Sequence, residues 1–446
     1  MANAASLFSQ LLRHFPRTEF ALLVKKHGAE RHAKGFACWD QFIAMLFRHL
    51  ARADSPREIC GGLSCCLGKL AHLGVGRAPK RSTLSYANEH RPTALYEDLF
   101  WTAMERFRGQ GRLGGGKTGF RFKNKLLSLD STTVSLCLNL FPWAKFRRAK
   151  GGVKVHVMLD HADYMPSFVL ITEARRHDVT AARKIRLVAG SIVAMDRVYN
   201  DYTLFARFWP MPNGWQWTED GVFFVTRMKE KTVFEVVEER KPPKNRNILC
   251  DRIIRPAGIK AAAKCPHLLR RVVVWDAEKE RQIVLLTNHL GFGATTIAAI
   301  YKERWQIELF FKALKQNLKV KTFIGTTENA LRIQIWTALI AMLLLKWLHH
   351  LVQGGMVALQ SRRHAAHEPV HLPRSQGLAR LALRNPAHDP DRRTIDARSA
   401  RTWTATCKRR TRGLNSISRR QGHGSIVISG EKRSLQNVLD SSGIIY

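Results

Sequence analysis

A series of short apolar runs between residues 120 and 228 constrains this chain most strongly. Each run has the length and the apolar content of a buried strand, and turn-forming or polar residues separate the runs. The runs are Lys125–Leu129, Val153–Leu159, Ser167–Thr172, Ser191–Met195 and Val222–Thr226. A helical stretch, Ala181–Val188, falls between the third and the fourth run. Strands and helix in one segment predict a mixed α/β core.

Three strands, a helix and then a strand is the order of elements that opens the ribonuclease-H-like fold. We therefore predict that residues 120–352 form a core of that type. Within it, residues 229–290 read as a β-rich insertion, with short strands separated by Pro, Asn and charged residues. The predicted strands there are Val233–Val237, Ile248–Ile254, Arg271–Trp275 and Ile283–Leu286. Helical patterns return at Thr296–Leu318 and at Ile333–Leu351.

Residues 1–108 read as a helical domain, because apolar residues recur at helical spacing, as in Leu95, Leu99, Ala103 and Phe107. The whole chain carries 73 Lys and Arg against 35 Asp and Glu, a net charge of +38. Such an excess favours a polyanionic partner, and nucleic acid is the obvious one. Four basic residues surround a predicted helix that starts near Ser82: Arg77, Lys80, Arg81 and Arg91. We predict a helical DNA-binding domain, with a solvated basic face as the alternative.

Residues 109–119 form a predicted glycine-rich linker. Their sequence matches the consensus of a phosphate-binding loop at Gly111, Gly116, Lys117 and Thr118. A helix precedes this match and a strand follows it, the reverse of the context that the motif needs, so a hinge is the better interpretation. After Gln353 the composition becomes rich in Arg, Pro, Ser and His without any period. Residues 353–446 are therefore predicted to be a low-order, disordered basic tail.

The chain shows no sign of export or of a membrane span. Residues 1–18 lack the basic start, apolar centre and cleavage site of a signal peptide. The segment Ile333–Val352 is apolar, but its charge-free part, Ile335–Leu345, is too short to cross about 30 Å of hydrocarbon. A buried core helix is expected, in a cytoplasmic, nucleoid-associated protein that has no membrane partner.

Two aspartates follow predicted strands. Asp130 ends the run Leu126–Leu129, and Asp196 ends the run Ile192–Met195. A carboxylate after a buried strand is costly to dehydrate unless a cation or a donor meets it. Two of them on neighbouring strands point toward one cleft and favour a metal site, although turns and helix caps also use Asp in this way.

A polar stripe marks the predicted helix from Tyr301 to Lys315. At about 100° per residue, Tyr301, Arg304, Glu308 and Lys315 fall within an arc of roughly 60°. A carboxylate on this face could complete a metal site, and the cations and the phenol could hold phosphates. A surface helix with an Arg–Glu pair explains the spacing alone equally well.

These motifs together resemble those of bacterial insertion-sequence transposases of the DDE type. The spacing of Tyr301, Arg304, Glu308 and Lys315 is similar to the Tyr–Arg–Glu–Lys signature of that family. The match extends to the aspartate motifs Leu129–Thr132 and Met195–Tyr199 and to the small helical N-terminal domain. The resemblance covers about residues 1 to 350.

The resemblance implies a role for each of these residues. Asp130, Asp196 and Glu308 would be the catalytic triad and the metal ligands. Tyr301, Arg304 and Lys315 would contact DNA phosphates at the transposon end. The implied activity is metal-dependent strand cleavage at transposon ends, followed by strand transfer into target DNA.

The chemistry of phosphodiester cleavage agrees with this implication. Two Mg²⁺ ions about 3.5–4 Å apart activate the attacking water and stabilise the leaving oxygen. Three carboxylates suit Mg²⁺, a hard cation that prefers oxygen ligands, and Mn²⁺ is expected to substitute. The expected partner is double-stranded DNA, both terminal inverted repeats and target, with the enzyme as a homodimer in that complex.

Two alternatives stay open at this point. Trp275, in the predicted insertion, could stack a flipped DNA base, although a packing role is commoner for a large aromatic residue. The chain could also be a catalytically inactive protein that binds transposon ends, or a decayed copy, because its C-terminal composition departs from the family pattern.

Overall fold

The computed structural model describes residues 7–363, with gaps at 32, 34, 67–68, 111–112, 114–118, 148–149, 210–220, 245–246 and 319–322. Most of the predicted linker at 109–119 lies outside the described residues, as does the predicted tail from residue 364 onward.

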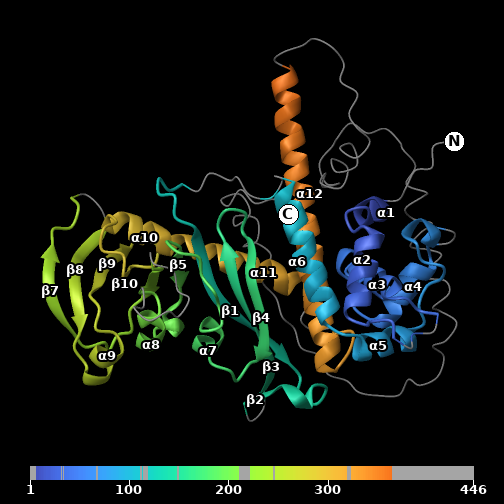
Figure 1. Ribbon diagram of the computed structural model, residues 1–446, viewed down its shortest axis with the longest axis horizontal. Helices are drawn as coiled ribbons and strands as arrows, with labels where there is room; N and C mark the ends of the chain where they lie inside the picture. The colour runs from blue at the N-terminus through green and yellow to red at the C-terminus, as the bar shows by residue number, and fades with distance from the viewer. Residues whose placement is uncertain are drawn as a thin grey trace, which may run out of the picture. The chain divides into compact units, whose positions relative to one another are not determined.

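A ten-stranded mixed sheet is the main feature of residues 126–287 (Figure 1). Its order is β2-β3-β1-β5-β6-β10-β9-β8-β7, with β4 paired to β3. Strands β1, β5 and β6 are parallel to one another, and β3 runs antiparallel to β1. The strands are β1 (Leu126–Leu136), β2 (Lys145–Arg147), β3 (Lys150–Asp160), β4 (Met165–Glu173), β5 (Ile192–Met195), β6 (Phe223–Arg227), β7 (Phe234–Arg240), β8 (Ile248–Pro256), β9 (Leu269–Asp276) and β10 (Arg281–Thr287). The predicted mixed α/β fold is confirmed.

The segment predicted as a β-rich insertion continues this same sheet. Strand β10 pairs antiparallel with β6, and β9, β8 and β7 follow outward in turn. The insertion is therefore hydrogen-bonded to the core rather than appended to it by a loop.

Helices cover both faces of the sheet (Figure 1). On one face, Ala182 of α7, Tyr199 of η3 and Phe205 of α8 pack with Leu127 and Leu129 in one apolar cluster. On the other face, the buried side of α10 packs on Leu126, Ile192 and the strands beyond, and α11 contacts β1. These elements are α7 (Asp178–Ala182), η3 (Arg197–Tyr199), α8 (Tyr202–Ala206), α9 (Ile259–Lys264), α10 (Ala294–Glu303) and α11 (Trp305–Leu318), with η2 (Pro142–Ala144) before β2.

The first part of the described chain is helical, as predicted. Its elements are α1 (Leu7–Leu12), α2 (Arg17–Lys26), α3 (Cys38–Leu50), α4 (Pro56–Ser64), η1 (Leu70–Leu73), α5 (Arg81–His90) and α6 (Ala94–Gly109). Its core is aromatic, with Phe20 packed against Trp39 and Phe42.

The last described helix, α12 (Glu328–Arg363), packs on this helical part. Trp347 stacks on Phe107 of α6 at 5.0 Å between ring centroids, and His49 of α3 hydrogen-bonds Thr337. Within the described residues, Glu328–His350 is the one segment long and apolar enough to span a membrane, and 72% of its most apolar window is buried. That burial matches the predicted core helix.

Three predicted boundaries are wrong. The helix predicted at Ala181–Val188 is α7, which starts earlier and ends at Ala182. The helix predicted through 301–315 divides into α10 and α11 at Arg304. The helix predicted to end near Leu351 runs to Arg363, past the predicted tail boundary at 353. Apolar periodicity predicts where a helix lies. It does not predict the residue at which a helix breaks, or how far a helix continues into polar sequence.

Candidate active site

The sheet register brings the two predicted aspartates to the same level. The parallel pairing of β1 with β5 ends at Leu129 and Met195. Asp130 and Asp196 are the next residues on the two strands, so they leave the paired segment side by side. Only β5 ends there: β1 continues to Leu136, with Asp130 paired to Val157 of β3. The sequence predicts that Asp130 ends its strand, and this is wrong. Asp130 lies within β1, because β3 supplies a partner after β5 stops.

Glu308 reaches this place from α11. It lies in the first turn of that helix, where a carboxylate interacts favourably with the helix dipole. Because side chains alternate along a strand, Asp130 shares the face of Leu126, which is the face that α10 and α11 cover. The break between the two helices falls at Arg304, whose backbone N–H bonds the carbonyl of Tyr301 at 3.2 Å.

Arg304 joins two of the three carboxylates. Its guanidinium donates to Asp130 at 2.7 Å and lies 3.5 Å from Glu308. The side chains of Arg304 and Asp130 are 13% and 14% exposed, so this ion pair is largely withdrawn from water. Glu308 is more exposed, at 41%.

The electrostatics of the site are dominated by burial. Burial raises the pKa of Asp130 to about 7, and repulsion from Glu308 and Asp196 adds to the effect. The Arg304 cation and the backbone N–H of Ser131, which donates to Asp130 at 2.7 Å, act in the opposite direction. The three acids therefore lie within one another's fields, and additional positive charge would favour their ionised forms.

The chemistry of the donor groups at this site suits a divalent cation, but the carboxylates are too far apart to bind one ion together. Three carboxylates are the ligands that Mg²⁺ prefers. Among the described residues, however, no three His, Cys, Asp or Glu side chains lie close enough to hold one ion. The guanidinium of Arg304 lies between Asp130 and Glu308. The donor set fits the metal.

The three residues predicted to contact DNA besides Arg304 differ in how exposed they are and in how far they lie from the acidic residues. Tyr301 is half-buried, with the Arg304 guanidinium 5.6 Å from its ring centre. Lys315 is exposed further along α11. Trp275 lies near the end of β9 and is 39% exposed. No contact brings Lys315 or Trp275 to the acidic residues in the described part of the chain.

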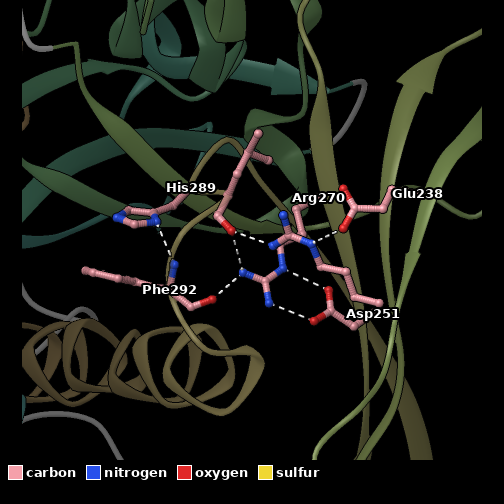
Figure 2. A network of polar contacts seen from close by, with 7 residues as sticks. Glu238, Asp251, Arg270, His289 and Phe292 are labelled. Atoms are coloured by element: carbon pink, nitrogen blue, oxygen red, sulfur yellow. Dashed lines mark hydrogen bonds and ion pairs between the residues drawn. The ribbon is translucent and has the colours of Figure 1, made fainter.

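A buried arginine fixes the segment that leads into α10 (Figure 2). Arg270 of β9 makes two hydrogen bonds with Asp251 of β8, at 2.8 and 2.7 Å. It also donates to the carbonyls of Leu290 and Phe292, just before α10. Arg240 of β7 donates to the same Leu290 carbonyl at 2.6 Å. Strands β7, β8 and β9 thereby fix the start of α10, the helix that carries Tyr301 and ends next to Arg304.

Sequence reasoning missed two features near the acidic residues. Trp305 is 56% exposed, and the ammonium of Lys279 lies 5.5 Å from its ring centre. Ser131 bonds Asp178 on the face of β1 opposite to Arg304. The adjacency of Trp305 to Arg304 was visible in the sequence, whereas the Ser131 contact depends on a fold that brings residues 47 positions apart together.

Residues 121–344 match the model of the transposase DDE domain family. The chain belongs to this family. Residues 3–76 of this DDE transposase match a second model, a domain of unknown function (DUF4372). The match confirms the predicted family and, with it, an enzyme that acts on DNA.

Three proteins similar to this chain are also named as transposases. A putative transposase, y4zB, of Sinorhizobium fredii is 34% identical over 299 residues, which are 65% of this chain and 78% of that protein. A probable transposase for insertion sequence element IS5377 of Geobacillus stearothermophilus is 32% identical, over 60% of this chain and 67% of that one. A putative transposase for element IS4SA of Synechocystis is 25% identical, over 64% and 76%.

Proposed function

We propose that Asp130, Asp196 and Glu308 form the metal-binding catalytic triad of this DNA transposase. The observation that carries the proposal is the sheet register, which brings Asp130 and Asp196 level, together with Arg304, which links Asp130 to Glu308. The order of β4, β3, β1, β5 and β6 supports a ribonuclease-H-like core around them.

Two Mg²⁺ ions, when bound, supply a Lewis acid on each side of the scissile phosphate. The chain's part is to hold three carboxylates at one place and to bring DNA to them. Arg304 leaves Asp130 and Glu308 and contacts a backbone phosphate, since a guanidinium binds phosphate as readily as carboxylate. Tyr301 and Lys315 add further phosphate contacts from the same two helices. A water then cleaves the end, and the freed 3′-OH joins it to target DNA.

The helical N-terminal part supplies a second DNA contact. Arg77, Lys80 and Arg81 are exposed at and before the start of α5, and no ion pair involves them among the described residues. Arg91, predicted with them, is buried and donates to the carbonyls of Phe36 and Ala37, so it belongs to the core. We propose that the three exposed cations bind duplex DNA at the terminal repeat.

Further features of the complex follow from the same proposal. An element has two ends, so a homodimer provides one active site for each. Trp275, being partly exposed, is available to stack on a DNA base. The protein acts at the nucleoid.

The test is incubation of the full chain with duplex DNA that carries the element's inverted repeat. Strand nicking at the repeat boundary that requires Mg²⁺ or Mn²⁺ supports the proposal. Binding of the repeat without nicking in either metal would instead identify an inactive end-binding protein.

A further inference from the structure

A hydrogen-bonded group of polar residues lies directly behind Asp130. We call it the brace and define it as Ser131, Lys154, His156, Thr172 and Asp178, from β1, β3, β4 and α7. Alternation along β1 puts Ser131 on the face opposite to Asp130, the face of Leu127 and Leu129. The brace therefore does not belong to the acidic site on the other face.

Asp178 is the centre of the brace. It accepts a hydrogen bond from the Ser131 hydroxyl and one of 3.1 Å from Lys154. His156 lies 3.5 Å from it. Asp178 is 12% exposed and Lys154 is 13% exposed, so this charge pair is held in a largely dry place. A buried carboxylate needs such partners, because a missing one leaves its desolvation uncompensated.

The remaining contacts tie the brace to the sheet. The other ring nitrogen of His156 bonds the Thr172 hydroxyl of β4 at 3.0 Å. The His156 side chain is fully buried, and His156 pairs with Ser131 in the β1–β3 register. Lys154 also donates to the carbonyl of Arg176 at 3.0 Å, just before α7. Three strands and one helix thus fix the position of Ser131.

Ser131 is also bonded to Asp130 itself. Its backbone N–H donates to the Asp130 carboxylate at 2.7 Å, while its hydroxyl donates to Asp178. One residue therefore connects the brace on one face with the acidic site on the other. A shift of Ser131 would turn the peptide that holds the Asp130 carboxylate.

We propose that Asp178 is a positioning residue, which acts through Ser131 to set the orientation of the Asp130 carboxylate for metal binding. This inference rests on the proposed function of Asp130. Partners that orient metal ligands affect metal affinity strongly, commonly by about 10-fold or more when removed.

Ser131→Ala tests the link, because it deletes the hydroxyl and keeps the backbone N–H. Mn²⁺ binding to the full chain is measured by electron paramagnetic resonance, beside the Mn²⁺ dependence of nicking and repeat binding in EDTA. We expect the half-saturating Mn²⁺ concentration to rise about 10-fold in both metal assays. Repeat binding in EDTA should remain within about twofold, a change of roughly 0.4 kcal/mol.

Two matched variants separate positioning from general weakening of the sheet. Ser131→Thr keeps the hydroxyl and should restore the wild-type Mn²⁺ requirement. Ser167→Ala removes a hydroxyl of β4 that donates to the carbonyl of Met158 on β3, at residues outside the brace, and should leave that requirement unchanged. Asp178→Asn, which keeps the side-chain size, provides a second perturbation if Ser131→Ala folds poorly, and should shift the requirement in the same direction.

Two outcomes contradict the inference. An unchanged Mn²⁺ requirement in both Ser131→Ala and Asp178→Asn overturns it, and so does a lower thermal midpoint without any metal effect. If the wild-type chain neither binds Mn²⁺ nor nicks DNA, the proposed function of the triad fails first.

Discussion

The guanidinium of Arg304 donates a 2.7 Å hydrogen bond to the carboxylate of Asp130, 174 positions away in the sequence. This contact crosses from the junction of α10 and α11 to the middle of β1, and both side chains are largely buried. It makes Arg304 the cation of the acidic site when no metal is bound.

Replacing Arg304 should therefore destabilise the metal-free protein. In Arg304→Gln, Asp130 loses its ion-pair partner, and breaking a buried pair costs about 3–5 kcal/mol. We expect the thermal midpoint in EDTA to fall and Mg²⁺ to recover more of it in the variant than in the wild type. Differential scanning calorimetry with and without Mg²⁺ measures both values. Equal midpoints in EDTA would mean that the pair contributes no stability.

Lys315 should contribute to DNA binding through charge alone. Each neutralised phosphate adds about 0.9 to the slope of log affinity against log salt on duplex DNA. Lys315→Ala should lower that slope by about this amount and weaken repeat binding. Lys260→Ala, an exposed lysine on α9 at the other face of the sheet, is the control and should not change the slope. The slope is measured by fluorescence anisotropy of repeat binding at several salt concentrations. An equal slope for Lys315→Ala and Lys260→Ala would contradict a phosphate contact by Lys315.

The pair of Arg270 and Asp251 should be essential for stability but replaceable as a unit. Both side chains are nearly fully buried, at 3% and 6% exposure. Arg270→Met leaves Asp251 unpaired and removes the donor to the carbonyl of Phe292, while Arg240 still donates to that of Leu290. We therefore expect a loss of about 3–5 kcal/mol in the free energy of unfolding. Arg270→Met combined with Asp251→Leu should lose less than Arg270→Met alone. Urea denaturation of the two variants gives the comparison, and a double variant that is weaker than the single one would contradict it.

Two buried histidines should make the protein sensitive to acid. Burial lowers the pKa of His156 and of His161 to about 4 each, against about 6.5 in an unfolded chain. Between these values the unfolded state binds more protons, so stability is full above about pH 6.5 and falls as the pH drops toward 4. His161→Gln should reduce the slope of unfolding free energy against pH in this window. The slope, measured from denaturation at several pH values, would be unchanged if His161 were accessible to protons in the fold.

Much of the architecture could be predicted from local pattern. Every predicted strand overlaps an observed one, because buried strands in this sheet are short, apolar and bounded by turn residues. Asp130 and Asp196 were visible for the same reason, as carboxylates that directly follow apolar runs, whereas Glu308 was visible from the polar stripe of its helix.

What could not be predicted depends on pairing between distant segments. Asp130 looked like a strand end because the apolar run stops there, yet β3 continues the pairing to Leu136. Arg91 looked like part of a basic face, but Phe36 and Ala37 supply carbonyls that draw it into the core. The bond of Ser131 to Asp178 likewise exists only after β1 and α7 meet. Composition records none of these contacts.

The most direct test of the account is conservative substitution of the three acids. Asp130→Asn, Asp196→Asn and Glu308→Gln each remove one charge at nearly constant size, so binding of the inverted repeat should be largely retained. We expect each variant to lose Mg²⁺-dependent nicking at the repeat boundary, measured on end-labelled duplex beside repeat binding in EDTA. Nicking at the wild-type rate by any one variant would contradict the assignment of that residue to the triad.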